Sequence, residues 1–271
     1  MNGQFEGQVA LVAGASKGIG AATAKAFAAA GAAVVLGARD TAALKSVAAG
    51  IEARGGRALA VGTDVTDADS MRRLVDQAGS TFGRLDVAFN HAAAGPLPAP
   101  LAEIDPDEFD LGIATHVRGT FLGMKFQIPA MLASGGGAIV NMASIAGVNG
   151  TANLAAYVAG KAGIIGLTKV AALDYADQGI RVNVVAPGPI RTYHIEAAGE
   201  QAQRAAAMST PMRRMGTAAE VARAVLWLCS DESSFITGTV MPIDGGQAAG
   251  NKPPQMYRPG QPMPKPPATT G

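Results

Sequence analysis

The sequence predicts an α/β fold built on one parallel sheet, and three observations support this prediction. Short apolar runs alternate with helical stretches along the chain, which is the pattern of βαβ units. A glycine-rich turn separates the first apolar run from the first helical stretch, where a doubly wound sheet carries its phosphate-binding turn. No break in composition divides residues 1–247. We therefore expect a single doubly wound Rossmann domain over these residues, with about seven strands and with helices on both faces of the sheet.

The predicted strands are short apolar runs that end at glycine or polar residues. They lie at residues 8–13, 33–37, 57–61, 85–89, 138–142, 180–185 and 239–243. Helices are predicted at residues 21–30, 41–53, 67–82, 155–176 and 217–230, with a further long helix that begins at residue 105. Two helix starts carry capping signals, because Asp105 is followed by proline and Glu108, and Thr217 is followed by Glu220.

The composition excludes several classes of protein. The formal net charge is +1 and no dense run of lysine and arginine is present, so neither nucleic acid nor a membrane surface is an expected partner. No stretch reaches about 18 uninterrupted apolar residues, and the N-terminus lacks the pattern of a signal peptide. The single cysteine, Cys229, cannot form an internal disulfide, and the three histidines lack metal-ligand spacing. We expect a soluble cytoplasmic protein without a metal site.

A glycine-rich turn opens the first helix. Gly14, Gly18 and Gly20 stand in the spacing G-x-x-x-G-x-G, between the first apolar run and an alanine-rich stretch. Glycines in this place let the backbone approach a pyrophosphate closely, and the N–H groups of a helix N-terminus can then bind it. The turn therefore predicts a dinucleotide site.

Charged residues after the second predicted strand bear on the choice of dinucleotide. Arg39 can bind a 2′-phosphate through two parallel hydrogen bonds, and Lys17 of the glycine turn lies on the same side. Asp40, one residue further, could instead accept a hydrogen bond from the ribose 2′-hydroxyl, as an acid does in NAD sites. The sequence favours NADP(H) and leaves NAD(H) open.

The reactive residues are predicted on and before one helix. Tyr157 and Lys161 are four residues apart, so a helix places them on one face, one turn apart. A lysine in that position favours the phenolate and lowers the pKa of the tyrosine, which makes the phenol usable as an acid or base near neutral pH. Ser144 follows the predicted strand 138–142 and lies at its end. These three side chains can converge on one substrate oxygen.

The motifs together resemble those of the short-chain dehydrogenase/reductase family over residues 7–247. Several motifs occur in the order and spacing of the family, which is more specific than any one of them alone. The similar segments are Ala13–Gly20, Asp64 and Val65, Asn90–Ala93, the set Ser144, Tyr157 and Lys161 in S-x12-Y-x3-K spacing, Asn183–Gly188, Ile236–Gly238 and Asp244–Gly246. The enoyl reductase branch of the family is less similar, because it usually has a wider spacing between tyrosine and lysine.

The resemblance implies an NADP(H)-dependent oxidoreductase that reduces a ketone or aldehyde to an alcohol, or runs in reverse. Tyr157 would exchange a proton with the substrate oxygen, Ser144 would hydrogen-bond that oxygen, and Lys161 would lower the pKa of Tyr157 and hold the nicotinamide ribose. The implied cofactor contacts are Gly14, Ser16, Lys17, Gly18, Ile19, Gly20, Arg39, Asp64, Val65, Asn90, Ala92, Tyr157, Lys161, Pro187, Gly188, Ile190 and Thr192. The alternatives are an NAD(H)-dependent dehydrogenase of a hydroxylated metabolite and a non-catalytic cofactor-binding protein.

Four positions depart from the pattern of the family, namely Ala13, His91, Ala93 and His116. His116 stands where the family usually has an asparagine, which supports a water relay to Lys161 through its main-chain carbonyl at a helix irregularity. Any residue supplies that carbonyl, and an imidazole that titrates near neutral pH could also join proton transfer. His116 is therefore a candidate fourth catalytic residue, with a structural substitute as the alternative.

The last part of the chain is expected to select the substrate and to support assembly. Residues 189–216 resemble the substrate lid of the family, and apolar residues there and in the loop 94–101 predict an apolar pocket for a small carbonyl or alcohol. The tail 248–271 contains seven prolines and is predicted to be extended. The resemblance implies a homo-oligomer, a tetramer or a dimer, and we expect the tail to lie across a neighbouring subunit.

Overall fold

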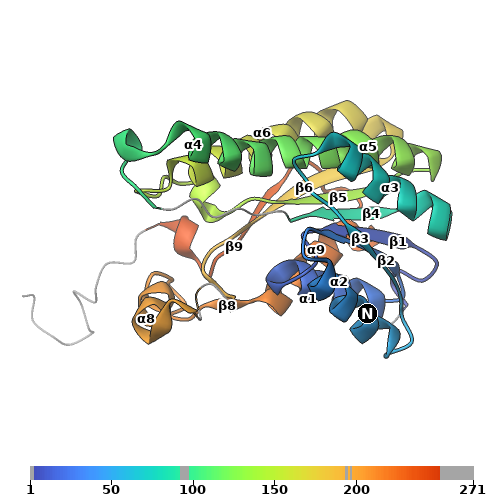
Figure 1. Ribbon diagram of the computed structural model, residues 1–271, viewed down its shortest axis with the longest axis horizontal. Helices are drawn as coiled ribbons and strands as arrows, with labels where there is room; N and C mark the ends of the chain where they lie inside the picture. The colour runs from blue at the N-terminus through green and yellow to red at the C-terminus, as the bar shows by residue number, and fades with distance from the viewer. Residues whose placement is uncertain (1–2, 92–97, 193–194, 196, 251–271) are drawn as a thin grey trace, which may run out of the picture.

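The computed structural model describes residues 3–91, 98–192, 195 and 197–250, and all structural statements below refer to these residues. Seven parallel strands form one sheet in the order β3–β2–β1–β4–β5–β6–β9 (Figure 1). They are β1 (Val9–Ala13), β2 (Ala33–Ala38), β3 (Arg57–Gly62), β4 (Val87–Asn90), β5 (Gly137–Met142), β6 (Ile180–Pro187) and β9 (Val240–Ile243). The strand order reverses between β1 and β4, which is the point where a doubly wound sheet binds its ligand. The predicted fold class is confirmed.

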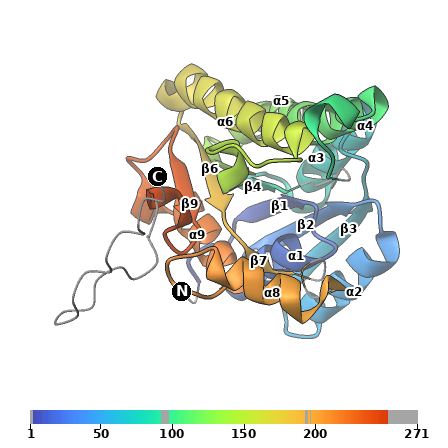
Figure 2. The ribbon, with the colours of Figure 1, turned by 90° about the vertical axis from the view of Figure 1, so that its left-hand side faces the viewer.

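Helices cover both faces of this sheet (Figures 1 and 2). They are α1 (Gly18–Ala29), α2 (Thr41–Glu52), α3 (Ala68–Phe82), α4 (Pro106–Ile113), α5 (Gly119–Ala133), α6 (Ala155–Tyr175), α8 (Gly199–Met208) and α9 (Ala218–Cys229). Alternate residues of β1 point to opposite faces, so Val12 packs with α1, α2 and α9, whereas Leu11 and Ala13 pack with α3, α5 and α6. The central strands are buried on both sides and are therefore mainly apolar, with the buried asparagines Asn90, Asn141 and Asn183 as exceptions.

A second, two-stranded element stands beside the main sheet. Strand β7 (Ile190–Arg191) pairs in parallel with β8 (Gly216–Thr217), and α8 lies between them in the sequence. Figure 2 shows α8 across the end of the molecule that carries β7, in front of the sheet. The capping box predicted at Thr217 is present, since the Thr217 hydroxyl accepts from Glu220 N at 3.2 Å and the Glu220 carboxylate accepts from Thr217 N at 2.8 Å.

Two predicted helices differ from the structure. Helix α1 begins at Gly18, inside the glycine turn, and not at residue 21. The long helix predicted from residue 105 is interrupted. Asp105 caps α4 by accepting from Asp107 N at 2.8 Å, but a single π-helical turn over Ala114–Arg118, hereafter the π turn, separates α4 from α5. The interruption falls at His116, where the resemblance implies a helix irregularity.

The stretch Ala155–Gln178, which contains helix α6, has the length and the apolar composition of a helix that could cross a membrane. A buried core helix meets the same criteria. Lys161 and Thr168 are buried on this helix, and both hydrogen-bond to groups inside the protein. These contacts to the sheet and to its own backbone identify α6 as a core helix of the fold.

Candidate functional site

The predicted reactive residues meet at the carboxyl ends of the central strands. Ser144 follows β5, and its hydroxyl donates to the Pro187 carbonyl at the end of β6, at 3.5 Å. The same hydroxyl accepts from Ala146 N at 3.2 Å, which fixes the turn after the strand. Tyr157 lies in the first turn of α6, and its phenol is hydrogen-bonded to Ser144. The structure therefore brings Ser144 and Tyr157 into contact at the carboxyl end of β5, the strand that follows β4 in the sheet.

The Lys161 side chain lies beneath this pair. It is only 1% exposed, its ammonium donates to the Met142 carbonyl at 3.0 Å, and Nζ lies 5.5 Å from the centre of the Tyr157 ring. Burial lowers the pKa of Lys161 to about 7, because an ammonium loses its hydration in the interior. Lys161 is thus close enough to interact electrostatically with the phenol, but burial makes its ammonium form less favourable.

The pKa of Tyr157 shifts in the direction opposite to the one expected from the sequence. Burial raises the pKa of Tyr157 above its usual value, and the hydrogen bond from Ser144 lowers it by a smaller amount. The sequence placed a cation four residues away, but it did not show that the phenol is itself buried. The ammonium of Lys161 also points to the Met142 carbonyl. Desolvation of the phenolate is the largest cause of the shift, and it exceeds the effect of the Ser144 hydrogen bond.

The buried lysine predicts a pH dependence of stability. The folded pKa, about 7, lies below that of an unfolded lysine, so the unfolded chain binds more protons between these values. The free energy of unfolding should therefore rise with pH above ~7, by at most about 1.4 kcal/mol per pH unit. Urea titrations of Lys161→Met should lack this rise. Lys125→Met, which removes an exposed lysine of α5, should keep it, and parallel curves for all three proteins would contradict the prediction.

The glycine turn has the geometry of a phosphate cradle. Gly14 and Gly18 have φ values of +83° and +54°, which favour glycine, and a Cβ on Gly20 would lie 2.1 Å from the Gly14 carbonyl oxygen. Helix α1 begins here with no side-chain cap at Lys17 and no acidic residue in its first turn. Its positive end is therefore left for an anion, and the turn fits a dinucleotide pyrophosphate.

The two charged residues after the carboxyl end of β2, Arg39 and Asp40, differ in their contacts near the expected ribose site. The Asp40 carboxylate caps α2 by accepting from Ala43 N at 3.0 Å, and it forms an ion pair with Lys17 at 3.4 Å. The hydrogen bond from Ala43 is the main reason why the pKa of Asp40 is lowered. Arg39 is exposed beside it, and its charge contributes to the lowered pKa of Asp64, after the hydrogen bonds from Thr66. Asp40 is thus engaged within the protein, whereas Arg39 faces solvent.

Other predicted cofactor residues have clear structural partners. The Asp64 carboxylate accepts from Thr66 N at 2.9 Å and from its hydroxyl at 2.8 Å, while Val65 packs against Gly119. Gly188 N donates to the Ile243 carbonyl at 3.1 Å. Ile190 is buried in the core, and a Cβ on Gly18 would lie 3.8 Å from the Thr192 methyl. The segment after β6 therefore borders the glycine turn, as expected for the two sides of one site.

Asn90 performs a structural task that the sequence did not indicate. Its side-chain amide donates to Gln127 Oε1 at 3.0 Å and to Asn141 Oδ1 at 2.9 Å, and it accepts from Gln127 Nε2 at 2.8 Å. Asn141 in turn donates to the Thr168 hydroxyl at 3.0 Å. This amide network joins β4, β5, α5 and α6 in the core. The Asn90 side chain is therefore engaged in the core. The predicted contact of Asn90 with the cofactor stays a prediction, and it would have to come from the main chain.

Two histidines occupy the floor of the site. His116 is fully buried, and its ring meets that of Tyr157 edge-to-face, with centroids 5.4 Å apart. His91 stacks on Phe89, and its Nδ1 is buried without a hydrogen-bond partner among the described residues. Burial, with smaller contributions from Lys161 and His116, lowers the pKa of His91 to about 3. His91 is therefore neutral near pH 7, and the only sequence signal for its place in the site was its departure from the family pattern.

Several predicted positions lie outside the described residues. They are Ala92, Ala93, residues 94–97 of the loop 94–101, residues 193, 194 and 196 of the predicted lid, and the tail from residue 251. The predictions missed Gly160, a described residue that lies against the imidazole of His116. The available signal was a glycine in the interior of a helix, next to Lys161.

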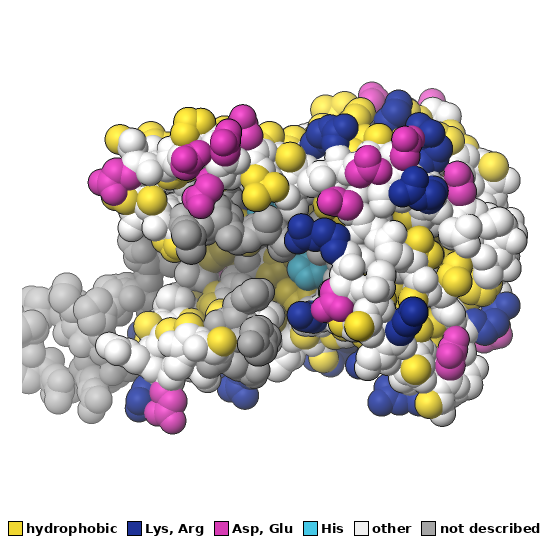
Figure 3. Space-filling model, viewed as in Figure 1, with side chains coloured by type: hydrophobic (Ala, Val, Ile, Leu, Met, Phe, Trp, Pro, Cys, Tyr) yellow, Lys and Arg dark blue, Asp and Glu magenta, His cyan; other side chains and the backbone are white. Residues whose placement is uncertain are grey.

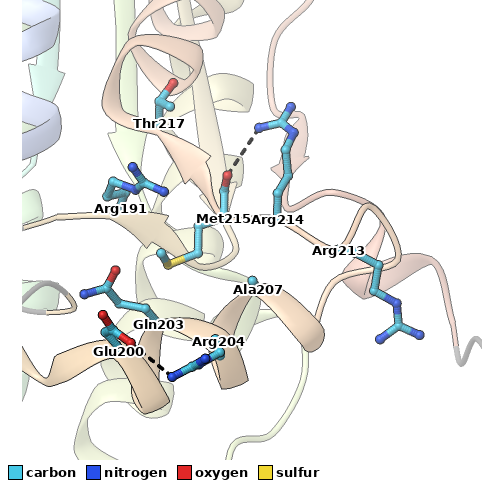
Figure 4. Close-up of a pocket in the computed structure, with 9 residues that line it drawn as sticks. All are labelled: Arg191, Glu200, Gln203, Arg204, Ala207, Arg213, Arg214, Met215 and Thr217. Atoms are coloured by element: carbon cyan, nitrogen blue, oxygen red, sulfur yellow. Dashed lines mark hydrogen bonds and ion pairs between the residues drawn. The ribbon is translucent and has the colours of Figure 1, made fainter.

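A cavity of about 650 Å³ lies apart from this site, between α8 and the β7–β8 pair (Figure 4). It is lined by Arg191, Glu200, Gln203, Arg204, Ala207, Arg213, Arg214, Met215 and Thr217. Most of its arginines are already bound within the protein. Arg204 pairs with Glu200 at 3.1 Å, Arg214 pairs with Glu220 at 2.7 Å, and Arg213 donates to the Met208 carbonyl at 2.7 Å. The cavity is therefore not a free cationic clamp for a phosphate.

The charged side chains are unevenly distributed over the face of the molecule in Figure 3. Acidic side chains gather over α4, whose first turn contains Asp107 and Glu108, whereas both basic and acidic side chains border the hollow at the centre of the view. The described residues contain no group of histidine, cysteine and acidic side chains that could hold a metal ion.

Comparison with known proteins supports an oxidoreductase. A family profile described as enoyl-(acyl carrier protein) reductase matches residues 14–248. The chain is 43% identical over 250 residues to cis-4-hydroxycyclohexanecarboxylate dehydrogenase of Sinomonas cyclohexanicum, covering 92% of this chain and 100% of the relative. It is 42% identical over 245 residues to cyclohexanol dehydrogenase of Acinetobacter sp. strain SE19, covering 90% and 96%. A solved short-chain type dehydrogenase/reductase from Mycobacterium ulcerans matches with a TM-score of 0.88 and 32% identity, over 93% of each chain.

Proposed function

Because the chain belongs to the short-chain dehydrogenase/reductase family and is an NAD(P)(H)-dependent oxidoreductase acting on CH–OH groups, we propose that it interconverts a ring ketone and its secondary alcohol with NADP(H). The observation that carries this proposal is the meeting of Ser144, Tyr157 and Lys161 beside the glycine turn. The two relatives named as dehydrogenases of cyclohexane alcohols support a ring substrate. An aldehyde or open-chain ketone is the broader alternative.

The residues of the chain divide the reaction between them. The nicotinamide coenzyme supplies or accepts the hydride when it is bound. Tyr157 transfers its phenolic proton to the carbonyl oxygen in reduction and removes the proton of the hydroxyl in oxidation. Ser144, which already hydrogen-bonds the phenol, stabilises the developing charge on the same oxygen. The positive charge of Lys161 favours the phenolate form of Tyr157. Its ammonium holds the ribose hydroxyls when it is not hydrogen-bonded to the Met142 carbonyl.

The preference for NADP(H) is supported by the different situations of Asp40 and Arg39. An acid that binds the ribose 2′-hydroxyl must have a free oxygen directed to it, but Asp40 caps α2 and pairs with Lys17. Arg39 is exposed, and a guanidinium binds a phosphate in two-pronged geometry. The alternative of NAD(H) requires Asp40 to leave Lys17, which is possible because this ion pair is largely exposed.

Coenzyme selection can be tested with ring substrates. We expect turnover of cyclohexanone with NADPH and of cyclohexanol with NADP⁺, each with a higher kcat/KM than with NADH or NAD⁺. Arg39→Ala should raise the KM for NADPH by about tenfold, which corresponds to one charged hydrogen-bonded contact, and should change the KM for NADH little. Steady-state kinetics with both coenzymes measure this.

Asp40→Asn is the matched control for that experiment. If Asp40 only caps α2, the substitution should leave the KM for NADH unchanged, because asparagine also caps helices. If Asp40→Asn raised the KM for NADH and Arg39→Ala left the KM for NADPH unchanged, the results would support NAD(H) as the coenzyme. Absence of turnover with both coenzymes across linear and ring carbonyls would contradict the proposed reaction.

The lid, the assembly and the location of the protein are further parts of the proposal. Residues 189–216 include β7, α8 and β8, and Thr192 lies against the glycine turn, which supports their role as a lid over the coenzyme. Apolar side chains on the outer faces of α5 and α6, such as Phe121 and Leu173, are exposed and support self-association into a dimer or tetramer. The single, buried Cys229 is compatible with the cytoplasm.

A further inference from the structure

The π turn rests in a notch that two glycines leave on the surface of α6. A Cβ built on Gly160 would lie 2.8 Å from the Cβ of His116 and 2.9 Å from its Cδ2. A Cβ built on Gly163 would lie 2.8 Å from a methyl group of Val117. Real Cβ atoms do not tolerate such distances, so both contacts depend on the absence of a side chain on α6. The two glycines therefore determine how closely the π turn approaches the helix.

The contact at Gly160 reaches the reactive tyrosine. Tyr157 precedes Gly160 by three residues, so both lie on the same side of α6. The imidazole of His116 lies over Gly160, and its ring stands at 86° to the Tyr157 ring in an edge-to-face contact. Such contacts restrict the orientation of both rings. His116 is fully buried, so solvent does not compete for this position.

Several titratable groups lie near His116 among the described residues. On α6 they are Tyr157 and Lys161, and after β4 the neutral His91 is influenced electrostatically by both His116 and Lys161. The next residue of the π turn, Arg118, donates to the Thr66 carbonyl and is exposed. The imidazole therefore contacts the acid/base residue directly, through the edge-to-face contact of the two rings.

We propose that His116 and Gly160 form a matched pair that holds the ring of Tyr157 in its reactive orientation. His116 is then a positioning residue, because it acts on the substrate through Tyr157. A glycine is unfavourable in the interior of a helix, and here the missing side chain is what admits the imidazole. His116 lies at the centre of the π turn, and single π-helical turns are frequently found at functional sites. This inference rests on the proposed function of Tyr157.

The decisive experiment is a double-mutant cycle between positions 116 and 160. Gly160→Ala should lower kcat by about 10²-fold, because a displaced imidazole lets the phenol move by a fraction of an ångström to an ångström. The KM for the coenzyme should change by less than about threefold, since the glycine turn is untouched. His116→Gly also removes the Cβ that the new methyl group would meet. Adding Gly160→Ala to His116→Gly should therefore cost less than about threefold in kcat, which is a strong non-additive effect.

Two further glycines of α6 provide matched controls. Gly166 has open space around its Cα, so Gly166→Ala should leave kcat unchanged. Gly163→Ala disturbs the same notch at Val117 and not at His116, so it should lower the melting temperature without a comparable loss of kcat. Equal losses of kcat for Gly163→Ala and Gly160→Ala would overturn the proposal, because the effect would then be general disruption of the π turn. Additive effects in the cycle would overturn it as well.

A measurement without substrate separates this inference from the proposed reaction. The ionisation of Tyr157 can be followed by ultraviolet absorbance as the difference between the protein and its Tyr157→Phe variant. His116→Asn should shift this titration, and it should shift the pH–rate profile in the same direction. An unmoved titration overturns the positioning role. If no carbonyl substrate is turned over but the titration shifts, the proposed function fails and the pairing of His116 with Tyr157 stands.

Discussion

Tyr157→Phe should lower kcat for carbonyl reduction by about 10³-fold, with coenzyme affinity changed by less than about threefold. Phenylalanine keeps the ring that packs edge-to-face with His116, so the only loss is the hydroxyl that bonds to Ser144 and exchanges the proton. Because burial raises the pKa of Tyr157, the neutral phenol is the form that binds a carbonyl substrate, and reduction should persist over a wide pH range. Single-turnover measurements with saturating coenzyme report this step directly.

Tyr175→Phe is the control for that substitution. Tyr175 ends the same helix and packs against the core on the far side from Ser144, so its variant should retain full activity. A Tyr157→Phe enzyme that kept more than a tenth of the parent kcat would show that another group donates the proton. The pH–rate profile of His116→Asn would then identify whether the imidazole is that group.

Gly20→Ala should weaken coenzyme binding by at least about 10²-fold and lower the melting temperature by several degrees. A Cβ at this position would lie 2.1 Å from the Gly14 carbonyl oxygen and 3.1 Å from the His91 ring. The first of these is main chain, which cannot turn away as a side chain can, so α1 and the turn must separate. The N–H groups that receive the pyrophosphate then lose their common direction. Coenzyme titration by fluorescence and a thermal melt measure the two effects.

Gly50→Ala is the matched control, since Gly50 lies inside α2 and a Cβ there meets nothing within 4 Å. The alanine should raise stability by about 0.5–1 kcal/mol, because it restricts the unfolded chain and favours the helix. Coenzyme affinity should stay unchanged. If Gly20→Ala bound the coenzyme as well as Gly50→Ala does, the glycine turn would not be the phosphate cradle.

The sheet and the glycine turn were predictable from the sequence because their signals are local. An apolar run that stops at a glycine, followed by alanine-rich residues, determines β1, the turn and α1 without information from the rest of the chain. The set Ser144, Tyr157 and Lys161 was predicted because its spacing occurs together with the other motifs of the family, in their order. The spacing of a tyrosine and a lysine alone recurs on many helices. The shift of the Tyr157 pKa was not predictable, because burial depends on which elements cover the phenol.

The interruption of the helix after residue 113 shows a second limit of prediction from local sequence patterns. The sequence from Pro106 to Ala133 contains no break in its helical pattern at His116. The π turn fits there because Gly160 and Gly163 leave room for it on α6, more than forty residues later in the chain. A local pattern cannot report a contact between two helices that are distant in sequence. The internal role of Asn90, which depends on Gln127 and Asn141, was missed for the same reason.

The amide network around Asn90 has a consequence for how this protein tolerates substitutions. It ties the strands that end at the reactive residues to α5 and α6, through Gln127, Asn141 and Thr168. The segment 189–216 takes no part in it and stands outside the main sheet, with its own strand pair. Helix α8, in the middle of that segment, contains none of the predicted catalytic or coenzyme residues, whereas Thr192 near its start lies against Gly18. We therefore expect substitutions on α8 to disturb the reactive residues less than substitutions in the amide network.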